Sequence, residues 1–123
     1  MSREKYFVDT NLFLRYLTKD DPARYGRCRD LFKKAVEGEV SLHTSEMVIA
    51  ELIWTLLSYY KVPKAEVIEK VSIIISTPNL HLVDKAIIAD SLVLYSQRNI
   101  HFMDAYNTLF MKFHGLGKIY SYD

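Results

Sequence analysis

The chain has 123 residues, of which 50% are apolar and 25% are charged, and this predicts one compact domain over residues 1–123 rather than a disordered chain. Sixteen Lys and Arg against fifteen Asp and Glu leave a formal charge of +1, which excludes a strongly basic nucleic-acid coat protein. The single cysteine, Cys28, excludes an intramolecular disulfide and a CxxC metal site. Apolar runs are too short to cross a bilayer and no signal-peptide core is present, so we expect a cytoplasmic protein without a membrane partner.

Short β-prone segments alternate along the chain with longer segments of helical periodicity. The β-prone segments predict strands at residues 5–9, 40–44, 80–83 and 118–122, the first of them buried. The periodic segments predict helices at residues 11–18, 22–37, 45–60, 64–76, 85–97 and 102–114, with Pro22 in the first turn of the second and Ser45 capping the third. Brief strands separated by helices favour the α/β class, with a mainly parallel sheet covered by helices on both faces.

Acidic residues stand near several strand ends of this predicted sheet, and ligands of parallel sheets bind outside the carboxyl ends of the strands. Asp9 ends the first strand, where it is also a good helix N-cap, and capping does not exclude metal binding. Asp123 closes both the last predicted strand and the chain. Asp104 begins the last helix, where the helix dipole alone would also favour an acid.

Glu51 falls on or beside the apolar face of the helix predicted for residues 45–60, with Val48 and Trp54 as helical neighbours. A buried carboxylate costs several kcal/mol unless a cation or hydrogen-bond donors meet it. Glu51 is therefore expected either to pair with an arginine or to bind a metal ion. Asp90 also has apolar helical neighbours, but it falls in the middle of a helix and is expected to be solvated.

Carboxylates that converge at one sheet edge repel each other unless hard divalent cations such as Mg²⁺ or Mn²⁺ neutralise them. Such ions activate water and stabilise the leaving oxygen in phosphodiester hydrolysis. The four histidines lack the paired spacing of a zinc site, and the sequence has no GxGxxG, Walker A or GxSxG motif. Cys28 lies between two arginines, but we interpret it as an ordinary helix residue.

The chain resembles the PIN-domain family, specifically the VapC-like toxin ribonucleases of type II toxin–antitoxin pairs. The resemblance covers essentially the whole chain and depends on four segments in order: FVDTNLFLRYL, SEMVIAELIWTL, FMDAYNTLFM and IYSYD. Two departures stand out. His101 replaces an acid found in many relatives, and relatives continue for several residues beyond the position of Asp123.

The resemblance implies a three-layer α/β/α sandwich around a short, mainly parallel sheet, as in other PIN-like folds. It places Asp9, Glu51, Asp104 and Asp123 on the acidic quartet of the family, as catalytic residues that bind Mg²⁺ or Mn²⁺. It further implies an endoribonuclease toxin acting on RNA, homodimerisation, and neutralisation by a cognate antitoxin protein. Asn11 and Ser45 match polar residues of the family that orient the first carboxylate or contact substrate.

Two other functions stay open at this point. The chain could be a PIN-like module that binds RNA or a partner protein with little or no catalysis. A small phosphatase or a phospho-acceptor receiver domain also places acids at strand ends, but a receiver would need adjacent acids after its first strand, and Asp20 and Asp21 fall in a loop instead. A basic stretch of the second helix, residues 24–34, could guide an RNA backbone, although charge runs on helices are usually solvated.

Overall fold

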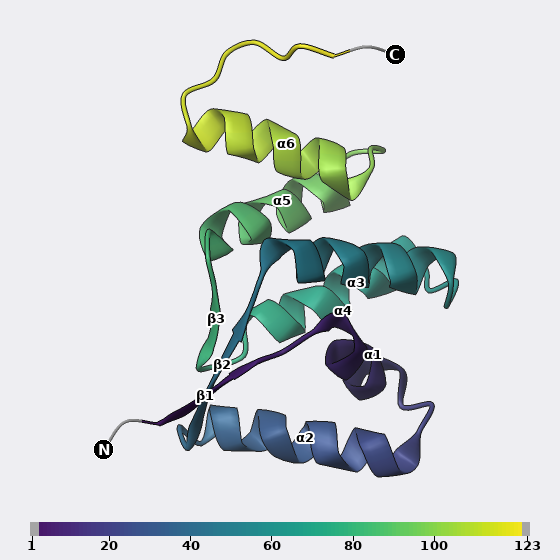
Figure 1. Ribbon diagram of the computed structural model, residues 1–123. Helices are drawn as coiled ribbons and strands as arrows, with labels where there is room; N and C mark the ends of the chain where they lie inside the picture. The colour runs from purple at the N-terminus through teal and green to yellow at the C-terminus, as the bar shows by residue number, and fades with distance from the viewer. Residues whose placement is uncertain (1–2, 122–123) are drawn as a thin grey trace. The chain divides into compact units, whose positions relative to one another are not determined.

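Three short parallel strands alternate with helices in the computed structural model, which describes residues 3–121 (Figure 1). The strands are β1 (Glu4–Phe7), β2 (Val40–Thr44) and β3 (Leu80–Leu82). The helices are α1 (Thr10–Thr18), α2 (Pro22–Val36), α3 (Glu46–Ser58), α4 (Lys64–Ile75), α5 (Lys85–Gln97) and α6 (Phe102–Phe113). This alternation confirms the α/β class and the parallel sheet expected of a PIN-like fold. The chain divides into two compact units, one ending at Lys85 and the other beginning at Ala86.

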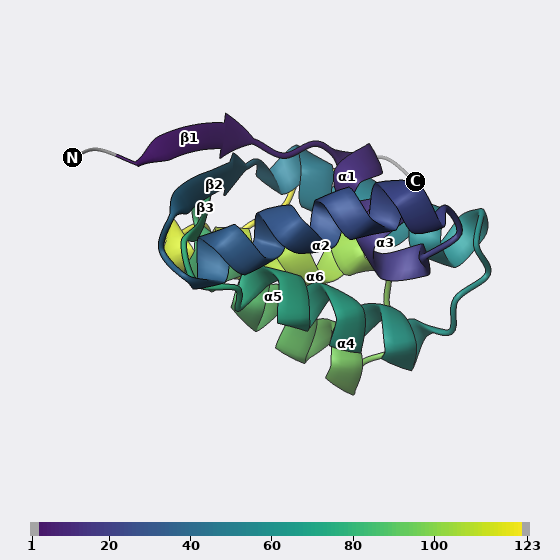
Figure 2. The same cartoon turned by 90° about the horizontal axis from the view of Figure 1, so that it is seen from below.

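The sheet belongs to the first unit and has the strand order β1-β2-β3, with β1 as an outer strand (Figure 2). In its register Phe7 pairs with His43, and His43 pairs with His81. Because side chains alternate along a strand, neighbouring pairs face opposite sides of the sheet. Leu42 and Leu80, which pair with each other, are 0% and 2% exposed, so this side of the sheet is the one that packs into the core.

The expectation of a buried first strand is wrong. All four residues of β1 are exposed, and Phe7 is 66% exposed. Burial of a strand depends on what covers the faces of the sheet: α2 packs against β2, whereas the side chains of β1 lie outside this cover. The chain enters the core one residue later, at the fully buried Val8. Apolar composition alone does not reveal whether a strand lies at the edge or in the centre of a sheet.

Side-chain caps define where three of the helices begin. The carboxylates of Asp9 and Asp21 and the hydroxyl of Ser45 accept hydrogen bonds from backbone amides in the first turns of α1, α2 and α3. Pro22 occupies the first turn of α2, as expected from its fixed φ angle. That helix ends before Gly38, whose φ of +80° is a conformation that favours glycine.

The core of the first unit forms where α1 packs against α2 and α3, and α3 packs against α4. Phe13 of α1 and Leu52 of α3 are fully buried. Tyr16 stacks on Phe32 with ring centroids 4.3 Å apart, which joins α1 to α2. These contacts hold α1, which Asp9 caps, and α3, which contains Glu51, within one packed unit.

The second unit contains most of α5, the whole of α6 and the segment that follows. Tyr95 of α5 meets Phe102 of α6 edge to face, with ring centroids 5.9 Å apart. Residues 118–121 do not form the strand predicted there, and Tyr122 lies outside the described residues. Ile119 and Tyr120 are 68% and 90% exposed, because β-prone side chains form a strand only where a neighbouring backbone pairs with them. None of the described helices is long and apolar enough to span a membrane.

We expect Thr44→Val to lower the free energy of unfolding by about 1 to 3 kcal/mol, because it leaves a buried carbonyl without its donor. The Thr44 hydroxyl donates to the backbone oxygen of Val8 at 2.8 Å, in a buried position that joins the ends of β1 and β2. Urea denaturation measures the change. Thr44→Ser keeps the hydroxyl and should retain most of the stability, whereas equal midpoints for wild type and Thr44→Val would contradict this role.

Candidate functional site

Asp9 lies at the carboxyl end of β1 and caps α1. One of its carboxylate oxygens, Oδ1, accepts a hydrogen bond from the Leu12 amide at 3.1 Å, and the residue is exposed. The cap therefore uses one oxygen and holds the carboxylate in a fixed position at this sheet edge, while lone pairs of the group stay accessible from solvent. Asn11, in the first turn of α1, is exposed as well.

Glu51 lies in the middle of α3 and is exposed, so the expectation that it is buried is wrong. The apolar face of α3 that enters the core contains Ile49, Leu52 and Ile53 instead. Glu51 shares its exposed side with Met47 and Trp54, which are 81% and 68% exposed and stand four residues before it and three after it. The helical spacing correctly places apolar side chains beside Glu51, but Met47 and Trp54 are themselves outside the core.

Asp104 lies in the first turn of α6, in the second unit, with a side chain 61% exposed. Its Oδ2 accepts a hydrogen bond from the His101 amide at 3.2 Å, and the His101 ring lies 3.7 Å from the same oxygen. Asp123 lies outside the described residues. Among residues 3–121, no group of three or more His, Cys, Asp or Glu side chains is gathered closely enough to hold a metal ion.

The donor chemistry of these acids is compatible with Mg²⁺ or Mn²⁺. Carboxylate oxygens are the ligands that both ions prefer, and Asp9, Glu51 and Asp104 are all exposed. Asp90, by comparison, is exposed in the middle of α5, as predicted for a solvated acid.

Two histidines that lack the sequence spacing of a zinc site lie side by side on the sheet. His43 and His81 pair across β2 and β3, and their rings stack with centroids 4.8 Å apart and an interplanar angle of 26°. The His43 Nε2 is 2.9 Å from the Ser41 hydroxyl. Burial and the nearby charges of His81 and Lys5 lower the pKa of His43 below its usual value, so the ring is neutral at pH 7. Only the strand register, which sequence spacing does not reveal, brings the two rings together.

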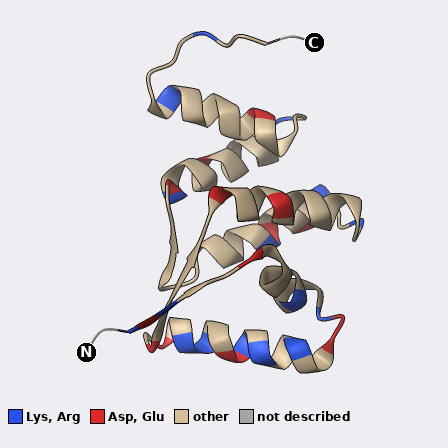
Figure 3. Cartoon of the chain, in the orientation of Figure 1, with Lys and Arg blue, Asp and Glu red and all other residues tan. Residues whose placement is uncertain are grey.

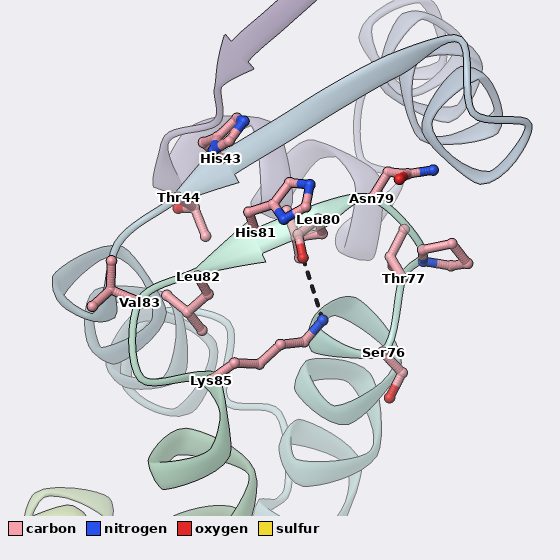
Figure 4. Close-up of a pocket in the computed structure, with 11 residues that line it drawn as sticks. His43, Thr44, Ser76, Thr77, Asn79, Leu80, His81, Leu82, Val83 and Lys85 are labelled. Atoms are coloured by element: carbon pink, nitrogen blue, oxygen red, sulfur yellow. Dashed lines mark hydrogen bonds between the residues drawn. The ribbon is translucent and has the colours of Figure 1, made fainter. Parts of the chain in front are cut away.

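A pocket of about 630 Å³ opens beside this histidine pair (Figure 4). It is lined by residues from the end of β2, the segment after α4, β3 and the start of α5: His43, Thr44, Ser76, Thr77, Pro78, Asn79, Leu80, His81, Leu82, Val83 and Lys85. The Lys85 ammonium reaches across it and donates to the Leu80 carbonyl at 3.3 Å. All of these residues belong to the first unit.

Cys28 is an ordinary buried helix residue, as expected, and the basic stretch of α2 is open to solvent. Cys28 is 7% exposed, and burial raises the pKa of its thiol although the Arg15 charge opposes the shift, so the thiol is not an activated nucleophile. Lys and Arg gather along the surface of α2 in Figure 3. The five basic side chains predicted there are exposed: Arg24, Arg27, Arg29, Lys33 and Lys34.

We expect Ser45→Ala to lower the free energy of unfolding by about 1 kcal/mol, because it removes the cap of α3. The Ser45 hydroxyl accepts from the Val48 amide at 3.3 Å. Ser45→Asn offers another capping oxygen and should restore the stability in thermal or urea denaturation. If Ser45→Ala unfolds like the wild type, the hydroxyl is not needed to start this helix.

Comparison with known proteins places the chain in a family. The sequence matches the PIN domain over residues 6–123, a span that crosses both units. No curated protein matches it. The crystal structure of Mycobacterium tuberculosis VapC20, described as a sarcin-ricin loop cleaving toxin, is similar with a TM-score of 0.44 and 20% identity, over 95% of this chain and 88% of that one. Since the PIN match covers nearly the whole sequence, the chain belongs to the PIN-domain family.

Proposed function

We propose that this protein is a Mg²⁺- or Mn²⁺-dependent endoribonuclease, the toxin of a VapC-like toxin–antitoxin pair, which hydrolyses phosphodiester bonds of RNA. The PIN match over residues 6–123 is the observation that carries the proposal, because it includes all four acids of the predicted quartet. Because the match runs through both units, we also propose that residues 1–123 act as a single PIN domain.

In this proposal Asp9, Glu51, Asp104 and Asp123 bind the divalent cation. The exposure of Asp9 and Glu51, and the packing of α1 against α3, support the assignment for the first unit. A bound Mg²⁺ or Mn²⁺ would lower the pKa of a water and stabilise the negative charge that develops on the phosphate. The exposed Asp104 of the second unit offers oxygen donors of the same kind.

The protein's own residues would position these donors. The hydrogen bond from Leu12 to Asp9 fixes one carboxylate oxygen, and Asn11 lies two residues further on in the same helical turn. Ser45 fixes the start of α3, on which Glu51 lies about one and two-thirds turns later. A carboxylate whose direction is fixed before the ion binds loses less conformational freedom in doing so.

The partners that we propose follow from the resemblance to VapC-like toxins. They are an RNA substrate, a cognate antitoxin protein and a second copy of the chain, in the cytoplasm. Exposed apolar side chains such as Trp54 and Met47 on α3 offer area for a protein contact.

Asp9→Asn and Glu51→Gln should each reduce RNA cleavage about 100-fold or more. Each substitution removes a negative charge that would hold the cation, and the cation would stabilise the transition state by several kcal/mol. The measurement is cleavage of total cellular RNA with Mg²⁺ or Mn²⁺, with EDTA in a parallel reaction. Asp90→Asn removes an exposed acid outside the proposed site and should leave cleavage unchanged.

Discrete fragments that disappear with EDTA and with either substitution would support the nuclease. RNA left equally intact by the wild type under both ions would overturn it and favour a PIN-like module that binds RNA or protein without catalysis. Fragments that persist in the Asp9→Asn and Glu51→Gln variants would instead assign cleavage to other residues or to a contaminating enzyme.

A further inference from the structure

We propose that the pocket beside His43 and His81 binds one nucleotide of a single-stranded RNA, with the base stacked against the histidine pair and a phosphate beside Lys85. The inference rests on the proposed ribonuclease function, since it assigns a substrate-binding role to a part of the first unit that contains none of the predicted acids. Figure 4 shows the two rings on the same face of the sheet, with Lys85 on the opposite side of the pocket.

The histidine pair provides a platform for a base. Cross-strand pairing places the rings 4.8 Å apart in a stacked arrangement, and His81 is exposed on its outer side. The His43 ring is held in place by the Ser41 hydroxyl, which lies within hydrogen-bond distance of its Nε2. Flat aromatic surfaces beside basic groups bind single-stranded nucleic acids without requiring a particular base, because every base has a face that can stack.

The charge around the pocket favours an anion over a metal cation. Lys85 lines it, and Arg3 donates to Asn79, another lining residue, at 2.7 Å. Lys5 lies close enough to His43 to affect its pKa. None of the lining residues is Asp or Glu, and Asp84, next to Lys85 in the sequence, does not line the pocket. The positive charges of Lys85, Arg3 and Lys5 oppose a divalent ion at this pocket and attract a phosphate.

The size and lining of the pocket also suit a nucleotide. A volume of about 630 Å³ falls within the range of ligand pockets. Pro78, Leu82 and Val83 contribute apolar surface for a base or ribose. Lys85 uses one of its three N–H donors on the Leu80 carbonyl, which leaves two for phosphate oxygens.

The position of the pocket relates it to the proposed chemistry. His43 is the residue before Thr44, whose hydroxyl bonds to Val8, the residue before Asp9. The backbone amide of Val8 also donates to the His43 carbonyl at 2.8 Å. The platform and the first proposed metal ligand are therefore joined through neighbouring residues at the carboxyl end of β1 and β2, and a strand held at one would pass near the other.

The test measures binding apart from cleavage. A fluorescently labelled oligoribonucleotide of about ten nucleotides is titrated with the full chain in EDTA, where the proposed cleavage does not occur, and anisotropy gives Kd. His81→Ala should weaken binding about tenfold by loss of stacking. His81→Phe, which keeps a flat ring, should bind like the wild type. Lys85→Gln should weaken binding and lower the slope of log Kd against log salt by about 0.7, the value for one phosphate contact on a single strand.

His114→Ala and Lys112→Ala, at the end of α6, are the matched controls and should leave Kd unchanged. The inference would be overturned if wild-type protein does not bind the oligonucleotide, or if the pocket variants change Kd by less than twofold. A free mononucleotide that binds as tightly as the oligonucleotide would also overturn it, since the ligand would then be a small molecule and not an RNA strand. The same preparations are also tested for cleavage of total RNA. RNA that is bound but not cut would show that the proposed ribonuclease function has failed while the binding site has not.

Discussion

Two hydrogen bonds at the carboxyl end of the sheet determine where the candidate functional residues of the first unit lie. The Val8 amide donates to the His43 carbonyl, and the Thr44 hydroxyl donates back to the Val8 carbonyl, both at 2.8 Å. Val8 is fully buried and Thr44 is 7% exposed, so neither bond competes freely with water. Immediately after this pair of bonds, the side chains of Asp9 and Ser45 cap α1 and α3, which begin one residue later.

This arrangement separates two kinds of chemistry on one small unit. Asp9 and Glu51 are exposed acids on α1 and α3, whereas the pocket beside β2 and β3 is lined by histidines and a lysine and by no acid. In the proposed nuclease, acids suited to a hard cation and basic groups suited to phosphate would serve different parts of the same substrate. A nuclease needs both, because it must hold a negatively charged strand beside a cluster of negatively charged ligands.

Much of the fold could be predicted because local signals agreed with each other. The bounds of β2 and α5 match the prediction residue for residue, and Pro22, Ser45 and Gly38 mark helix ends by known backbone preferences. The predictions that were wrong concern features that depend on contacts between residues distant in sequence. The exposure of β1 depends on which helices cover the faces of the sheet, and the absence of a strand at residues 118–121 depends on whether a backbone pairs there. The histidine pair depends on the register of β2 and β3.

The candidate acids were found from their types and positions, but their surroundings were not. Glu51 was expected to be buried because Trp54 and Val48 are apolar, yet Trp54 is 68% exposed and lies on the same side of α3. An apolar neighbour predicts burial only if it lies in the core itself. The metal role of Asp9, Glu51, Asp104 and Asp123 stays a prediction, supported by the PIN match and by oxygen donors that are open to solvent.

Paramagnetic broadening by Mn²⁺ tests most directly whether these acids bind the same ion. In a ¹H–¹⁵N spectrum of the full chain, substoichiometric Mn²⁺ should broaden the amide signals around Asp9, Glu51 and Asp104 together, and excess Mg²⁺ should restore them. Signals around Asp90, an exposed acid of α5 outside the proposed set, report non-specific binding. Broadening confined to one of the two units, or spread equally over all exposed acids including Asp90, would contradict the account.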